Sequence, residues 1–444
     1  MYSQKPTIYL KLAIWLCFFS HLQQLSLARK TKSRGVRRRL TQSEGCILSK
    51  VHTELDDGNT LHSWECELQP GDADQAGVLF VNLDGLNDTD LDAAAVSGET
   101  TLYAEGAVIA DGRLSIPKGS KKTLGKIDKR GPADKAKKSK KGTKKGRKLI
   151  PTAPVPRKVL VVRVDALDAN TTADVPTLAG DIFGIGRDSN YVCLSERLRS
   201  CSYGQTQVTP YNGVTRNNVT IQNGVIEMVL DMAVTGSPAS KIHNEVLKRL
   251  RLWLGIPNLS SVFDHVMLCL PPGTMGTWIA YAYVNNWFSV YNNDWCRYPS
   301  SQVHEIGHNL GLNHAGEGPL VYGDRTGYMG YSYPAFNQKM CYSPVKSWQL
   351  GWYAQKQETL DFNSRGGFTG SLIGIDDYLN SKAVGKYVQL RVPGPYEDLY
   401  IGFNRNTGIN TDTKEAANQV TVQAQTGTGV SDLRARLSTG NQYV

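Results

Sequence analysis

The densest group of chemically active side chains in this 444-residue sequence is the run His304-Glu-Ile-Gly-His-Asn-Leu-Gly-Leu-Asn-His314. Residues four apart share one face of a helix, so His304 and His308 can present two imidazole nitrogens to a single ion. Gly311 can take the positive φ that ends a helix and turns the chain, which brings His314 back as a third ligand. Three protein ligands at about 2.0–2.1 Å leave the fourth tetrahedral position of zinc open to water, as in catalytic sites. The spacing therefore predicts one catalytic Zn²⁺ ion.

Glu305 follows the first histidine directly and is not needed as a ligand. Zinc lowers the pKa of a bound water, so Glu305 can take a proton from that water and deliver it to a departing amine. The residues thus predict a zinc-dependent metalloendopeptidase with Glu305 as its general base. The short His-Glu-x-x-His core also occurs by chance as two surface histidines on a helix, but Gly311 and His314 add spacing that favours the peptidase.

This stretch resembles the metzincin clan of zinc endopeptidases, in which a methionine turn follows the third ligand. Met329, in Gly-Tyr-Met-Gly-Tyr, and Met340 are the two candidates, and the glycine-rich setting favours Met329. The resemblance implies that Met329 forms a polarisable floor beneath the imidazoles, the alternative being an ordinary core methionine. It also implies that Tyr331, two residues later, ligates zinc or binds the transition state.

Within the clan, the sequence resembles the gametolysin family (peptidase family M11), the matrix and cell-wall metalloproteinases of volvocine algae. The likeness runs from Val159 to about Val422 and includes the segments 323–332, 341–352 and 399–410. It implies extracellular protein or glycoprotein substrates, such as hydroxyproline-rich wall or matrix glycoproteins. Some relatives carry Gln at the first ligand, whereas this chain keeps His304, so zinc remains the expected metal.

The surrounding residues predict the elements that must hold the site. A β-branched run at Lys158–Asp165 is typical of a buried strand, and Ser240–Gly255 has apolar residues at helical spacing before a glycine stop. Further strands are expected within 224–234, 263–270 and 278–291, then a helix over about 300–310 and β-like patterns beyond Trp352. The fold class expected is α+β: a metzincin-like domain with a mixed sheet and an active-site helix.

The chain is expected to comprise five segments. These are a signal peptide (1–28), a β-rich pro-region (29–118), a basic linker with a processing site (119–149), the metzincin-like catalytic domain (150–352) and a β-rich C-terminal region (353–444). The apolar run Leu12–Phe19 is shorter than the roughly 20 residues that cross a membrane, which favours a signal peptide over an anchor. We therefore expect a protein secreted to the matrix or cell wall, with no membrane span in its mature form.

An oxidising compartment makes the eight cysteines interpretable, because most should pair there. Cys17 leaves with the signal peptide, and an odd number of cysteines follows the linker, so one of these is free or pairs elsewhere. Secretion also agrees with four glycosylation sequons, at Asn87, Asn170, Asn218 and Asn258.

The net charge of +10 comes from the linker, where about 14 Lys and Arg stand against 2 acids between Gly119 and Lys148. The tract has no interleaved aromatics, so no nucleic-acid partner is expected. Its Lys144–Lys148 end is a target for a basic-specific processing protease, although a plain linker is the alternative.

The region before Leu149 is expected to inhibit the enzyme until the linker is cut. A thiolate of Cys46 or Cys66 could occupy the open zinc position. Neither lies in a Pro-Arg-Cys-Gly-type setting, which favours a Cys46–Cys66 disulfide and a steric block. A catalytically inactive matrix glycoprotein is the competing class of function, but such a protein should have lost a ligand or Glu305, and this sequence retains them all.

Overall fold

The computed structural model describes residues 38–39, 45–127, 156–330, 334–362, 366–380 and 383–443. The predicted signal peptide and most of the predicted linker lie outside these ranges. Within them the chain is a mixture of helices and sheets, which agrees with the α+β class expected. None of the helices described is both long and apolar enough to traverse a bilayer.

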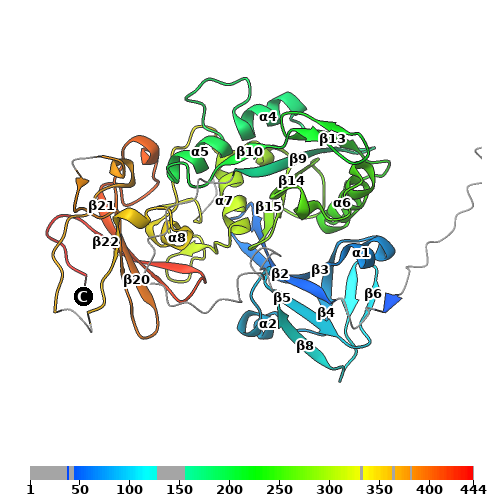
Figure 1. The fold of residues 1–444 in the computed structure, drawn as a ribbon, viewed down its shortest axis with the longest axis horizontal. Coiled ribbons are helices and arrows are strands. Elements are labelled where there is room, and N and C mark those ends of the chain that lie inside the picture. Colours follow the sequence, from blue (N-terminus) through cyan, green and yellow to red (C-terminus); the bar gives the residue numbers. More distant parts are fainter. Residues whose placement is uncertain are drawn as a thin grey trace, which may run out of the picture.

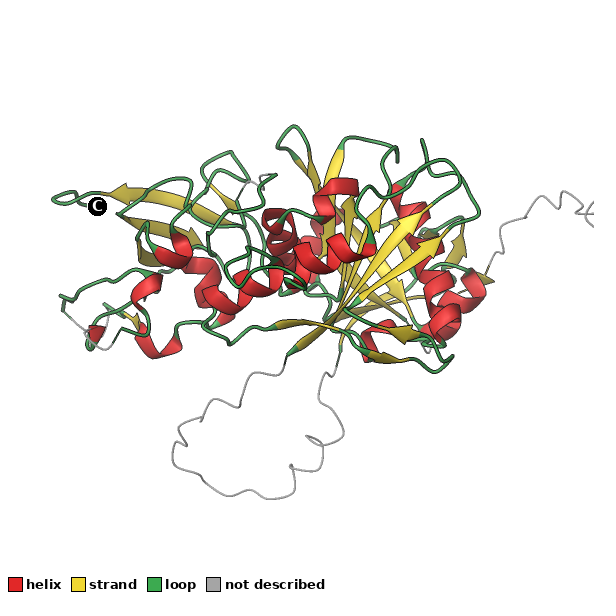
Figure 2. Ribbon diagram, turned by 90° about the horizontal axis from the view of Figure 1, so that it is seen from above, coloured by secondary structure: helices red, strands yellow, loops and turns green. Residues whose placement is uncertain are grey.

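The central part of the chain is built on a twisted mixed sheet, whose strands fan out in Figure 2. Strand β9 carries the β-branched run and pairs in parallel with β10, β13 and β14. The order then continues through β16 to β15, which is antiparallel to β16. These strands are β9 (Arg157–Asp165), β10 (Val208–Pro210), β13 (Val225–Val229), β14 (His265–Leu270), β15 (Trp278–Tyr283) and β16 (Phe288–Asn292); a separate pair is β11 (Gly213–Val214) and β12 (Thr220–Ile221).

Alternating side chains of β9 enter two separate cores, because successive residues of a strand point to opposite faces. Leu160 and Val162 pack with helix α6 (Ala239–Leu254). Val159 and Val161 pack in the other core with α4 (Val175–Phe183), α5 (Leu194–Cys201) and α7 (Pro299–Asn309). The histidine-bearing helix α7 is therefore buried against one face of the sheet (Figure 1).

The first part of the chain extends the same sheet. Strand β2 pairs antiparallel with β15, and Phe80 stacks on Phe288 with ring centroids 5.3 Å apart. Figure 1 shows these elements in blue and cyan beside the green central sheet. They are β1 (Arg38–Arg39), β2 (Cys46–Leu55), β3 (Thr60–Leu68), α1 (Pro70–Ala76), β4 (Phe80–Asp84), α2 (Asp88–Ala94), β5 (Thr100–Ala104), β6 (Val108–Ala110), β7 (Arg113–Ser115) and β8 (Lys122–Lys126).

A second sheet of six strands forms most of the C-terminal part, drawn in orange and red in Figure 1. Its strands are β17 (Ala315–Gly316), β18 (Gln357–Thr359), β19 (Gln389–Val392), β20 (Asp398–Asn404), β21 (Gln419–Gln425) and β22 (Ser431–Leu437), and helix α8 (Pro344–Leu350) packs on it. Strand β17 directly follows His314 and pairs in parallel with β22. The sheet predicted beyond Trp352 therefore includes a strand from the metal-site region.

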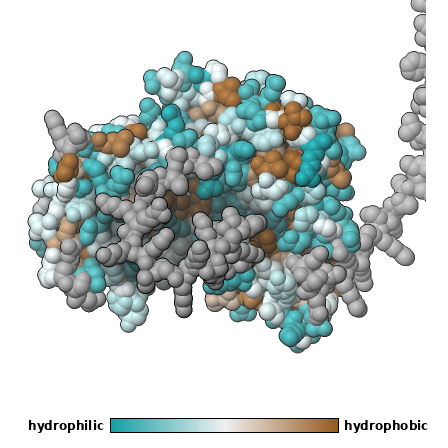
Figure 3. Space-filling view, viewed as in Figure 1, coloured by the Kyte–Doolittle hydropathy of each residue, from teal (hydrophilic) through white to brown (hydrophobic). Residues whose placement is uncertain are grey.

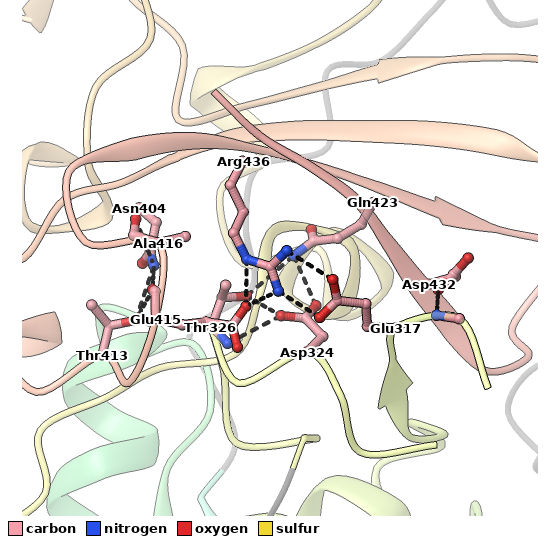
Figure 4. A network of polar contacts seen from close by, with 11 residues as sticks. Glu317, Asp324, Thr326, Asn404, Thr413, Glu415, Ala416, Gln423, Asp432 and Arg436 are labelled. Atoms are coloured by element: carbon pink, nitrogen blue, oxygen red, sulfur yellow. Dashed lines mark hydrogen bonds and ion pairs between the residues drawn. The ribbon is translucent and has the colours of Figure 1, made fainter. Parts of the chain in front are cut away.

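A polar network joins the two regions (Figure 4). The Arg436 guanidinium of β22 forms ion pairs with Glu317 and Glu415, and Gln423 of β21 donates to Asp324 at 3.0 Å. The coloured residues on the face seen in Figure 3 are mostly hydrophilic, with apolar residues in separate patches.

Most of the elements expected near the site are present. Gly255 ends α6 with φ 67°, as the glycine stop predicts. The single β stretch expected over 278–291 is two strands, β15 and β16, joined by a turn in which Asn285 has φ 53°. The short helices α4, α5 and α8 were not anticipated, since fewer than three turns give little periodic signal.

Candidate metal centre and active site

Helix α7 carries the first two histidines on one buried face. Pro299 occupies its first turn, where a missing N–H costs nothing. His304 and His308 are both fully buried. Between them, Gly307 faces a packed wall: a Cβ there would lie 2.4 Å from the Met329 sulfur and 2.9 Å from the Tyr342 hydroxyl. Only glycine lets the helix approach this wall so closely.

The chain reverses after α7 and returns the third histidine to the same place. Gly311 has φ 91°, and the Leu312 N–H donates to the Gly307 carbonyl at 3.0 Å. His314 then lies with its Nε2 atom 3.0 Å from that of His308. The C-terminal sheet fixes this return, since the Ser431 N–H donates to the His314 carbonyl at 3.1 Å.

Backbone carbonyls orient the two helical imidazoles. Nδ1 of His304 lies 2.6 Å from the Tyr328 carbonyl oxygen, and Nδ1 of His308 lies 2.8 Å from that of Leu312. A proton on each Nδ1 satisfies these carbonyls and leaves Nε2 with a free lone pair. Nε2 of His304 has no hydrogen-bond partner although it is buried. An orphaned acceptor of this kind is expected where a metal ion binds.

A fourth group, which sequence reasoning missed, completes the cluster. Glu54 of β2 reaches the three histidines, and the four residues form a buried group that could hold a metal ion, with all ligand atoms within 4.8 Å of one another. Its position carries no local sequence signal, because it depends on the pairing of β2 with β15.

Glu305 is buried beside this cluster, with 1% of its surface exposed, and its Oε2 has no hydrogen-bond partner. Burial raises the pKa of Glu305 well above its ordinary value, and the negative charge of Glu54 raises it further. A carboxyl group in this environment holds a proton more readily than an exposed glutamate does.

The comparison with known proteins agrees with this geometry. Residues 160–379 match the model of the gametolysin peptidase family, M11, and this span contains the whole histidine cluster from α7 to His314. The chain belongs to the gametolysin peptidase family. A relative named autolysin, from Chlamydomonas reinhardtii, is 38% identical over 88 residues, which cover 19% of this chain and 14% of the relative. The match therefore spans only a small part of the relative's length.

The methionine candidates of this gametolysin-family chain are both buried, but they lie in different surroundings. Met329 contacts α7 at Gly307, directly between the first two histidines, and its carbonyl accepts from Ala315 at 2.8 Å. Met340 precedes Cys341, which is bonded to Cys201. The contact at Gly307 supports Met329 as the floor of the site. Tyr331 lies outside the described residues.

A second tyrosine, Tyr322, reaches the candidate site from the loop after His314. Its hydroxyl donates to Oε1 of Glu54 at 3.2 Å, and its ring lies 4.4 Å from that of His314. Tyr322 lies in a glycine-rich segment with no pattern that marks a site residue, so the sequence did not reveal it.

Three disulfides secure the described regions: Cys46–Cys66, Cys201–Cys341 and Cys269–Cys296. Cys193 is the unpaired cysteine among the described residues, which confirms the odd thiol expected. The Cys46–Cys66 bond is the disulfide expected as the alternative to a free thiol, and it leaves neither sulfur as a thiolate. The four sequon asparagines, Asn87, Asn170, Asn218 and Asn258, are all exposed.

Proposed function

We propose that this chain is a secreted zinc metalloendopeptidase that hydrolyses peptide bonds of extracellular matrix or cell-wall glycoproteins. The observation that carries the proposal is the convergence of three buried imidazoles, His304, His308 and His314, beside the buried carboxyl of Glu305. The signal-peptide pattern and the exposed sequons support secretion and glycosylation.

His304, His308 and His314 would hold the zinc ion, which supplies Lewis acidity toward water and the peptide carbonyl. Glu305 takes the proton of the attacking water and transfers it to the departing amine. Met329 supports the helix beneath the ligands, and Tyr322 is placed to hydrogen-bond a group at the reaction centre.

Strand β15 supplies a place for an extended substrate. Its outer side is paired with β2 of the pro-region over Trp278–Tyr283. Departure of the pro-region would leave β15 as an edge strand, to which a peptide can add by main-chain hydrogen bonds. The edge lies beside α7, so such a peptide passes the histidines. The relative named autolysin and the family's matrix proteinases support a wall or matrix target.

Chelation tests the proposal. The processed chain should lose peptide cleavage when a strong chelator removes its metal, and zinc should restore it. An inactive matrix glycoprotein would show no cleavage before or after metal addition, and that result in metal-loaded, processed protein would refute the proposal.

A further inference from the structure

Strand β2 presents two polar side chains to the metal centre. His52 and Glu54 are two residues apart, so they share one face of the strand. Both are under 5% exposed. The His52 ring lies 4.5 Å from that of His314, and β15 has a register shift between Trp278 and Ala280, opposite Leu55 and Glu54. Bulges of this kind commonly redirect side chains near active sites.

The carboxylate of Glu54 lies at similar distances from the three imidazoles. Its Oε1 atom lies 3.4 Å from Nε2 of His304, 3.4 Å from that of His308 and 3.1 Å from that of His314. A regular tetrahedron around zinc, with arms of about 2.0–2.1 Å, has edges of about 3.3–3.4 Å. The Glu54 oxygen therefore occupies the position expected of a fourth tetrahedral ligand, on the side of the histidines that faces the pro-region.

We propose that Glu54 is the fourth ligand of the metal ion in the uncleaved chain, so that the pro-region holds the enzyme latent by taking the position that water requires. This inference rests on the proposed zinc peptidase function and names the residue that regulates it. It also replaces the cysteine mechanism, because Cys46 and Cys66 are joined to each other.

The charge around Glu54 supports a cation at the centre of the group. The described contacts of its carboxylate are the three imidazoles, the Tyr322 hydroxyl and the carboxyl of Glu305. Burying two carboxyl groups together is unfavourable without compensating positive charge. A divalent ion between Glu54 and the histidines supplies that charge and binds the pro-region to the site.

The proposed ligand Glu54 and the pairing of β2 with β15 belong to the same short segment. Strand β2 pairs with β15 through His52, Thr53 and Glu54, so main-chain hydrogen bonds position the carboxylate. Cleavage of the linker would end the covalent tie between β8 and β9 but leave this pairing intact. Release of Glu54 therefore requires β2 to leave the sheet.

The test compares three uncleaved, full-length chains: wild type, Glu54→Gln and Glu65→Gln. Glu65 is a matched control, because it is another buried pro-region carboxylate at the same interface, where it accepts from the Tyr283 hydroxyl at 2.6 Å. Zinc content is measured first, and then the affinity of each chain for acetohydroxamate, a small zinc-binding probe. A cleft of about 270 Å³ opens beside Thr60 and Tyr322, and the Tyr322 hydroxyl contacts Glu54.

All three chains should bind zinc, and Glu54→Gln should bind acetohydroxamate about tenfold or more tightly than wild type, because the competing ligand is lost. Neither variant should cleave peptide before processing, because β2 still occupies the edge of β15, and Glu65→Gln should bind the probe as wild type does. A Glu54→Ala chain, which has no side-chain oxygen, should repeat the result.

Equal probe affinity in wild type and Glu54→Gln, or an equal gain in Glu65→Gln, would overturn the assignment of Glu54 while leaving the zinc peptidase intact. Absence of zinc from every chain, before and after processing, would instead remove the proposed function itself. The zinc measurement thus separates the two failures.

Discussion

Glu305 and Glu54 are buried beside the same three imidazoles, yet they reach them by different routes. Glu305 is adjacent to His304 on one helix, so its place follows from local spacing. Glu54 lies 250 residues earlier in the chain and arrives through a strand pairing. At the scale of single residues, the proposed chemistry comes from the first carboxylate and its restraint from the second.

Changing Glu305 to Gln should leave zinc binding and folding unchanged but lower kcat/KM of the processed enzyme by roughly 10²–10⁴-fold, because the amide cannot accept a proton. Peptide cleavage and zinc content are measured on the same preparation. Near-normal cleavage by the zinc-loaded variant would contradict the role of Glu305 as base.

Changing His314 to Ala should weaken zinc binding by more than the roughly 10–100-fold that follows loss of an outer-shell partner, since a direct ligand is removed. A competition titration against a metal chelator measures this. His62→Ala, at an exposed histidine of β3, is the control and should bind zinc as wild type does. Unchanged affinity in His314→Ala would mean that another residue is the third ligand.

The sequence allowed prediction of the residues whose geometry is local. His304, Glu305, His308 and the turn at Gly311 all lie within one helix and its end, so spacing alone places them. Tyr322 and Glu54 could not be predicted, because their positions depend on a loop path and on which strand lies next to β15. No local pattern encodes either.

At the scale of elements, α7 is held between the sheet and the loop that carries Met329. The helix has glycine at the closest point of this contact, and the disulfide Cys269–Cys296 ties β14 to the segment just before the helix. The ligands are therefore placed by packing and covalent links as well as by metal binding.

Gly307→Ala should destabilise the protein by about 1–3 kcal/mol, because the added methyl group overlaps the Met329 sulfur and the Tyr342 hydroxyl. Denaturant unfolding measures the change. The matched control is Gly71→Ala in helix α1, where nothing lies within 4 Å of the added Cβ, and where alanine should stabilise the helix slightly. Similar losses in both variants would show that the wall at Gly307 is not the cause.

At the scale of the whole molecule, the segments of the chain are interleaved. The large sheet contains strands from before and after the linker, and the C-terminal sheet takes β17 from the residues just after His314. Sequence patterns gave most of the individual elements near the site, since these depend on local periodicity. They could not predict which distant strands pair, because pairing between strands hundreds of residues apart produces no local periodicity in the sequence.

The junction between the two sheets should be sensitive to pH through Lys346 of α8. Burial lowers the pKa of Lys346 to about 7, although Asp324 nearby opposes the shift. The folded state therefore binds fewer protons than the unfolded state between about pH 7 and pH 10, and stability falls as pH falls through that window. The slope from this group is about 1.4 kcal/mol per pH unit.

Lys346→Met removes the titrating group. Between pH 9 and pH 7 the free energy of unfolding should therefore fall less in the variant than in wild type, with the two slopes differing by about 1.4 kcal/mol per pH unit. Denaturant unfolding at several pH values measures the difference. If the free energies of unfolding of the two proteins differed by the same amount at every pH in this window, the lowered pKa of Lys346 would be contradicted.

The pairing of β17 with β22 also sets an order of events during biosynthesis. A chain is made from its N-terminus, so the strand that bears Glu54 exists long before α7, and the Ser431 contact that fixes His314 comes later still. The segment that we propose as the restraint is thus synthesised first, and the residue that supports His314 is made near the end. Throughout its synthesis, the nascent protein therefore never contains the complete proposed site without the strand that bears Glu54.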